Sequence, residues 1–440
     1  MSTLDLEASA RLALDYARAC GADQAEASLH SGTGVSITAR HGELETIEKH
    51  NDGQIAISVY KDQKTGAASS ADFSEAGIKG TIDAAMSIAS FTGVDECLGL
   101  ADADRMAADL KDMDQFYRWD QTIEELGDIA LKCEAAALKV SDKISNSEGA
   151  SVSTYQGASV YANSHGFLSH RHGSQHSVSC SVIGEDDQGM QRDYWYDSHR
   201  NPAHLADAAQ IGEKAAERTV ARLGSRKISS TEAPVLFDPS MAKSLIGHLI
   251  NALKGGAIYK KASFMVDRID QQVLPDFVTL AEHPHLMSGH NSSLHDAEGV
   301  ATPAYREIIS AGKLCDYVLG SYTARKLGVE STANAGGVRN LRISHSQQTF
   351  EQLLTTMGTG LYVTELIGSG INMVSGDYSR GAAGFWVENG EVQFPVEEIT
   401  IAGNLLDMYA NIVAIGSDTD TRGNTHCGSI LLEKMTIAGS

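Results

Sequence analysis

The sequence predicts an α+β protein: an N-terminal region of helices and antiparallel sheet, then a mostly β C-terminal domain with one central amphipathic helix. Three observations predict this. Several segments carry apolar residues every three or four positions, the runs between them alternate apolar and polar residues, and glycine is frequent whereas proline is scarce. Because 440 residues exceed what one core holds, we expect domains over 1–226, with possible sub-parts 1–95 and 120–226, and over 227–440.

The first sub-part is predicted to begin and end with a helix. Apolar residues at helical spacing predict helices over 4–20 and 74–90. Between them the period-two pattern of half-buried antiparallel strands recurs. The predicted strands are 25–31, 34–40, 45–51 and 53–61.

The second sub-part repeats this order. A helix is predicted over 122–141 and another over 202–223, on either side of a group of strands. The predicted strands are 144–156, 158–166, 173–186 and 189–198, the last two forming a hairpin that turns at 185–189. The polar, turn-prone stretch 224–232 then separates this part from the C-terminal domain.

The central helix of the C-terminal domain begins at Asp238, an N-cap residue followed by proline, and ends at Gly255-Gly256. Most of the rest is predicted to be strand. Predicted strands are Gly358–Leu366 and Ile371–Val374, with a hairpin of Ala383–Glu388 and Glu391–Val396 that turns at Asn389-Gly390. A short late helix is predicted over 404–414.

The net charge and the positions of the cysteines exclude several classes of function. A formal charge of −22 repels phosphates, and no basic run offsets it, so the sequence argues against a nucleic-acid partner. The six cysteines are scattered and contain no CxxC pair, which argues against a disulfide framework or a zinc finger. With no signal peptide and no apolar stretch of membrane-spanning length, we expect a cytoplasmic protein that does not enter the membrane.

Long segments of the chain resemble the TldD/PmbA (TldD/TldE) family of bacterial peptidases. The run LKGGAIYKKAS after the central helix is similar to the family, as are the longer stretches 146–167, 365–392 and 427–439. In the TldD branch the helix carries HExxxH, which supplies two zinc ligands and the general base. Alignment through 253–263 places Ile246, Gly247 and Asn251 at those three positions. None of them can do the work of the motif, because zinc takes imidazole, thiolate or carboxylate ligands.

The chain therefore resembles the PmbA (TldE) branch, which lacks the metal motif. The resemblance implies a subunit of a cytoplasmic metalloprotease complex that acts on unfolded peptides, with zinc in a TldD-like partner and no cofactor or catalytic residue in this chain. Whether this chain counts as an enzyme stays open. One alternative is a stand-alone, non-catalytic peptide-binding or regulatory homodimer, since loss of all three motif residues permits it equally well. Another is a metallopeptidase with an atypical site of its own.

The atypical site would use the histidine-rich loop 282–299. Its candidate ligands are His283, His285, His290 and His295. The spacing matches no standard zinc pattern, and a proline and glycines break any helix that would align the side chains, so we favour a solvated loop near the cleft. His170, His172 and His176 are a second group that one strand face could display, and there an exposed strand is the preferred interpretation.

Peptide binding is the family property that does not need a metal in this chain. The resemblance implies an extended peptide added to a sheet edge, which uses main-chain hydrogen bonds. The candidate residues are Lys260, Lys261, Arg306, Arg339, Tyr362 and Thr364: the four basic side chains to meet a peptide carboxylate, the last two to line the cleft. Surface salt bridges are the competing and preferred interpretation for the basic residues.

Overall fold

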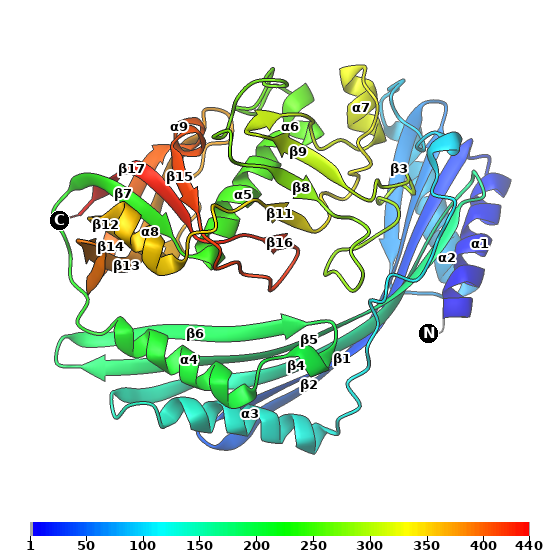
Figure 1. The fold of residues 1–440 in the computed structure, drawn as a ribbon. Helices are drawn as coiled ribbons and strands as arrows, with labels where there is room; N and C mark the ends of the chain where they lie inside the picture. Colours follow the sequence, from blue (N-terminus) through cyan, green and yellow to red (C-terminus); the bar gives the residue numbers. More distant parts are fainter. Residues whose placement is uncertain (1–2, 440) are drawn as a thin grey trace.

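The computed structural model describes residues 3–439 and confirms the α+β class (Figure 1). The α-helices are α1 Thr3–Ala19, α2 Glu75–Phe91, α3 Ile123–Leu138, α4 Ala208–Ala221, α5 Pro239–Leu253, α6 Gly255–Tyr259, α7 Ser321–Leu327, α8 Phe350–Met357 and α9 Leu405–Ala410, with 3-10 turns η1 Ala103–Arg105 and η2 Pro202–His204. The strands of the N-terminal half are β1 Gln24–Arg40, β2 Glu43–Lys61, β3 Lys64–Ser70, β4 Ile144–Asn163, β5 Leu168–Asp186 and β6 Gly189–His199. Those of the C-terminal half are β7 Thr231–Phe237, β8 Leu280–Glu282, β9 Arg306–Ser310, β10 Lys313–Leu314, β11 Leu341–Ile343, β12 Gly360–Ile367, β13 Asp377–Glu388, β14 Glu391–Asn404, β15 Ile412–Ile415, β16 Thr425–His426 and β17 Ile430–Ala438.

One antiparallel sheet, in the order β3-β2-β1-β4-β5-β6, runs through the whole N-terminal half. Its strands are longer than the sequence predicted: 25–31 and 34–40 are parts of the single strand β1, and 45–51 and 53–61 are parts of β2. Likewise 144–156 and most of 158–166 are parts of β4, which ends at Asn163. The predicted breaks fell at glycines whose φ angles are not positive, so these residues continue the strand instead of turning it.

The helices of this half cover one face of the sheet. Helices α1 and α2 pack on one end of it and α3 and α4 on the other, each pair over its own apolar cluster. The C-terminal half lies over the opposite, concave face (Figure 1). The predicted helix 202–223 is shorter than expected, because η2 occupies its start and Asp207 caps α4 through a hydrogen bond from the Ala209 amide. The sheet joins strands from both predicted sub-parts, and the division at residue 226 stays a prediction.

The C-terminal half contains a mixed sheet, in the order β14-β13-β12-β7-β17-β15, and a second sheet of short strands, β10-β9-β8-β11-β16. Helix α5 packs against β7 and β12 in the largest apolar cluster. The predicted hairpin is confirmed, with Asn389 and Gly390 both at positive φ between β13 and β14. Within the described residues no helix has the length and apolar character needed to cross a membrane.

Two local predictions for this half are wrong. Ile371–Val374 is a turn and not a strand, because the Asn372 side chain accepts a hydrogen bond from the Val374 amide and only Ile371 bridges to Tyr378. The predicted helix 404–414 stops at Ala410, since Ile412 and Ala414 pair with β17 as strand β15.

Candidate functional site

Helix α5 places the three positions that correspond to HExxxH in two different environments. Strand β7 leads directly into it through Asp238, whose carboxylate caps the Ser240 amide at 2.9 Å and accepts the Tyr362 hydroxyl at 2.9 Å. Ile246 is 1% exposed and belongs to the apolar core. Gly247 and Asn251 lie on the exposed side, and a Cβ added at Gly247 would meet no atom within 4 Å. A side chain therefore fits at Gly247, but these three residues present no zinc ligand set.

The histidines of the 282–299 loop do not converge. His285 contacts the Thr302 hydroxyl at 3.1 Å, His283 packs edge-on against Tyr305, and His290 lies beside His199 of β6. His295 is buried, with Nε2 2.8 Å from the Ser169 hydroxyl and Nδ1 2.6 Å from the Asp296 carbonyl. Within residues 3–439 no three His, Cys, Asp or Glu side chains are grouped to hold a metal ion.

The strand histidines also have separate environments. His170, His172 and His176 share one face of β5, as their even spacing predicted. His170 pairs with Glu7 at 3.1 Å, His172 packs against Phe116, and His176 hydrogen bonds to Thr154 and to the Tyr117 carbonyl at 2.8 Å each. Their contacts therefore differ, although His170 and His172 both line a cavity of about 540 Å³ together with His295.

The basic residues named from sequence are also divided. Arg306 donates to the Glu282 carboxylate, which is 1% exposed and accepts the Arg339 amide at 2.6 Å. The Arg339 guanidinium donates to the Gly337 carbonyl at 2.7 Å, and burial lowers its pKa. Lys260 and Lys261 follow α6 and are exposed. Arg306 and Arg339 thus sit in an internal polar network, while the two lysines stay on the surface.

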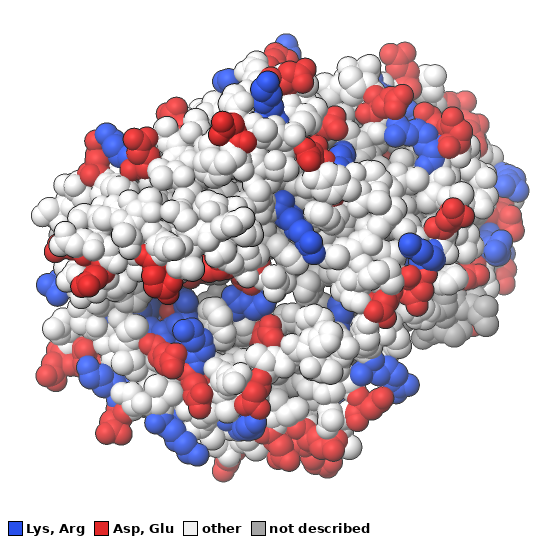
Figure 2. Space-filling model, viewed as in Figure 1, with Lys and Arg blue, Asp and Glu red and all other residues white. Residues whose placement is uncertain are grey.

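Among the six substrate-binding candidates, Tyr362 and Thr364 line one cavity together. They lie two positions apart on β12 and face a cavity of about 250 Å³, which α4 and β6 close from the other half of the molecule. The lining of this cavity is rich in charge, and Arg218 of α4 pairs there with Asp193 of β6 at 3.3 Å. Figure 2 shows the hollow between the two halves, with Lys and Arg side chains gathered along part of it and acidic side chains spread over the outer surface.

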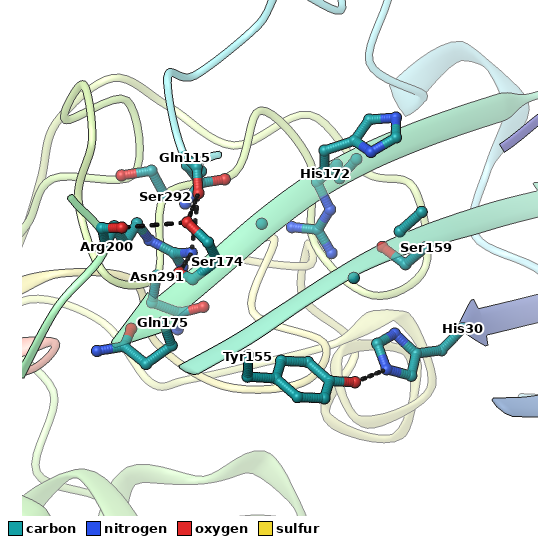
Figure 3. Close-up of a pocket in the computed structure, with 14 residues that line it drawn as sticks. His30, Gln115, Tyr155, Ser159, His172, Ser174, Gln175, Arg200, Asn291 and Ser292 are labelled. Atoms are coloured by element: carbon teal, nitrogen blue, oxygen red, sulfur yellow. Dashed lines mark hydrogen bonds between the residues drawn. The ribbon is translucent and has the colours of Figure 1, made fainter. Parts of the chain in front are cut away.

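The sequence did not predict another cavity, which has a volume of about 310 Å³. It lies on the concave face of the N-terminal sheet and is lined by residues of β1, β4 and β5, by Arg200 after β6, and by Asn291 and Ser292 of the C-terminal half (Figure 3). The sequence carried one signal for it, the glycines Gly32 and Gly157 between predicted strands and Gly173 at the start of another. Only the strand pairing shows that they meet.

The chain matches three successive family models: PmbA/TldA metallopeptidase domain 1 over residues 25–89, the central domain over 116–223 and the C-terminal domain over 230–439. It is also 46% identical over 434 residues to Metalloprotease PmbA of Escherichia coli O157:H7, an alignment that covers 99% of this chain and 96% of that protein. The chain belongs to the PmbA/TldD metallopeptidase family.

Other members of the PmbA/TldD family agree with this assignment. The Metalloprotease PmbA homolog of Haemophilus influenzae is 43% identical over 99% of this chain and 96% of its own length. A crystal structure from Bacteroides thetaiotaomicron, of a protein whose name refers to modulation of DNA gyrase, has a TM-score of 0.92 at 27% identity and covers 99% of both chains. TldE from Thermococcus kodakarensis shares the fold, with a TM-score of 0.79 at 20% identity over 99% of this chain and 100% of that one.

Proposed function

We propose that this chain is the non-catalytic, peptide-binding subunit of a two-chain metallopeptidase whose zinc is held by a TldD-like partner. The main support for the proposal is that α5 has one buried and two exposed residues at the three positions of the metal motif, and none of them is a zinc ligand. Ile246 is packed in the core, and Gly247 and Asn251 face outward without imidazole or carboxylate, so the helix offers a surface but no ligands. We propose a cytoplasmic location because the six cysteines are free thiols, as is usual in a reducing compartment.

The relatives support a division of labour between two chains. Buchnera aphidicola subsp. Acyrthosiphon pisum has both a Metalloprotease PmbA homolog, 37% identical to this chain over 407 residues, and a Metalloprotease TldD homolog, 23% identical over 245 residues. One organism thus keeps two family members, and this chain is more similar to the first. The cleft between the two halves, lined by Tyr362 and Thr364, is where we place an extended peptide.

The test measures zinc content and hydrolysis of an unfolded peptide for three samples: this chain alone, the HExxxH-bearing relative of the same organism alone, and the two mixed. We expect the two chains to co-elute, with zinc bound through the HExxxH chain and full activity only in the mixture. A partner whose motif glutamate is replaced by glutamine controls for activity that does not need the motif.

Two results would contradict the proposal. Stoichiometric zinc together with hydrolysis by the lone chain would show that this chain has a metal site of its own. A pair that neither co-elutes nor gains activity on mixing would favour a stand-alone binding homodimer, whose mass would then be measured by light scattering.

A further inference from the structure

Three glycines stand in one row across three neighbouring strands. Gly32 of β1 is directly opposite Gly157 of β4, which is directly opposite Gly173 of β5. Residues that oppose each other in a sheet point to the same face. Alternate positions of these strands, such as Leu29 and Val160, pack under the helices, so the glycine row lies on the concave face. The missing side chains of Gly157 and Gly173 leave a trough across these strands, whereas the Tyr155 ring occupies the space over Gly32.

The side chains that flank the trough are fixed by their own contacts. Tyr155 leans across it, and its hydroxyl lies 2.6 Å from His30 Nε2 (Figure 3). A Cβ at position 32 would come within 1.9 Å of that hydroxyl, so Tyr155 can lie there only because residue 32 is glycine. Ser159 lies opposite both His30 and Arg171 and completes the row on one side of the glycines.

Arg200 closes the trough at the edge of the sheet. Its guanidinium donates to the backbone carbonyls of Gly289 at 3.0 Å and Ser174 at 3.1 Å, and also to that of His290. These bonds join the sheet to the 282–299 loop and hold Asn291 and Ser292 over the cavity. The donors of Arg200 are therefore occupied by neutral acceptors, while its positive charge stays at the cavity wall.

The lining of this cavity is positively charged, although Arg171 also lines a neighbouring cavity together with Glu7 and Asp112. The lining of the 310 Å³ cavity holds two arginines and no aspartate or glutamate, although the chain has 57 acidic residues. The Arg171 side chain is exposed to the cavity and makes no hydrogen bond or ion pair with any part of the described chain. An exposed guanidinium that has no partner in the chain is open to an anionic ligand, and its planar fork matches a carboxylate.

We propose that this cavity binds the C-terminal carboxylate of a peptide, with the Arg171 guanidinium as its ionic partner and the glycine row beneath the last residue. The inference rests on the proposed function, because a peptidase subunit meets peptide ends, and it names a part of the ligand that the cleft alone does not specify. A volume of about 310 Å³ is at the lower end of ligand pockets and suits one terminal residue better than a longer segment. Phosphate shares the chemistry of a carboxylate, so the test separates these two sources.

The test uses the full chain alone and a flexible ten-residue peptide labelled at its N-terminus, made once with a free C-terminal carboxylate and once as the amide. Fluorescence anisotropy at low salt gives the two dissociation constants. We expect the amide to bind about tenfold more weakly or worse, as for loss of a charged hydrogen-bonded pair. Arg171→Gln should bind the two peptides equally. Arg18→Gln, which removes one exposed charge on α1, should keep the full difference.

Each remaining outcome overturns a different statement. If the unmodified chain binds acid and amide equally, the carboxylate site is wrong and the two-chain peptidase is unaffected. If inorganic phosphate displaces the acid peptide at micromolar concentration while amidation has no effect, the site is one for a free anion. If neither peptide binds and the mixed two-chain sample is still active, peptide binding does not belong to this chain, whereas an inactive mixture overturns the proposed function itself.

Discussion

Two arginine environments in this molecule differ in what surrounds the charge. In the C-terminal half, Arg306 donates to Glu282, to the Asn334 side chain and to the Thr332 carbonyl at 3.0 Å, and Glu282 also accepts from the Asn334 amide at 3.0 Å. On the concave sheet face, Arg171 has no such partner. Arginine thus has a different role in each of these two places. The enclosed guanidinium of Arg306, paired with its carboxylate, holds the fold together, whereas the exposed and unpaired guanidinium of Arg171 is available to a ligand.

The comparison makes opposite predictions for stability and for binding. Changes in the Glu282 network should act mainly on the free energy of unfolding, and changes at Arg171 mainly on affinity for anions. Three variants test this separation.

The largest expected effect is from Glu282→Gln. Among the described residues Glu282 is the one carboxylate that pairs with Arg306, and the substitution leaves a buried guanidinium uncompensated, so we expect the free energy of unfolding to fall by about 3–5 kcal/mol. Urea unfolding followed by circular dichroism measures it. The matched control is Glu232→Gln, whose pair with Lys434 is exposed and should matter little. Equal stability of both variants would contradict a structural role for the Glu282 network.

A smaller effect is expected from the pH dependence of His295, which lies between the two regions. Burial lowers its pKa to about 4, so the unfolded chain takes up a proton before the folded chain does. Its contribution to stability is complete above about pH 6.5 and is lost as the pH falls toward 4, a loss of about 2 kcal/mol at pH 5. The neighbouring Asp296, whose pKa burial raises to about 6, changes stability in the opposite direction.

The measurement therefore compares the unmodified chain with a His295 variant at each pH, so that the contribution of Asp296, which both proteins share, cancels. The difference in unfolding free energy between the unmodified chain and His295→Gln should shrink by about 2 kcal/mol from pH 7 to pH 5. Parallel pH profiles for the two proteins would show that His295 is not held neutral.

The smallest stability change is expected from Arg171→Gln. Since no residue of the described chain pairs with this guanidinium, its loss should change the free energy of unfolding by no more than about 0.5 kcal/mol, even though peptide discrimination is lost. Thermal unfolding of the same protein samples used for anisotropy checks this. A large destabilisation would place Arg171 with Arg306 among the structural cations and erase the contrast.

Local pattern in the sequence predicted most elements, and pairing across long distances accounts for what it missed. The amphipathic spacing of α5, its Asp238 cap and the Asn389-Gly390 turn are properties of a few neighbouring residues, and all are present in the structure. Glycines 32, 157 and 173 are far apart in the chain, and read one at a time the first two indicated breaks between strands and the third the start of one. Their alignment depends on the register of three strands, which no local pattern specifies.

The predicted substrate-binding residues show the same limit. Arg306 and Glu282 are 24 residues apart, so a count of basic side chains does not reveal that this arginine has a carboxylate beside it. Tyr362 and Thr364 were chosen for their place on a strand, and period-two spacing was enough to bring them to one cavity.

The long sheet of the N-terminal half also has a consequence for how the protein comes apart. Strand β1 pairs with β4 over fourteen positions, from Ala39 opposite Ala150 to Glu26 opposite Asn163, so the seam between the first and second sub-parts is as well bonded as the interior of either. Neither sub-part can open without exposing a full-length strand edge, which is a template for aggregation. The two should exchange their amide hydrogens as one cooperative unit, and a fragment cut within the 92–118 connection should be insoluble rather than an independently folding module.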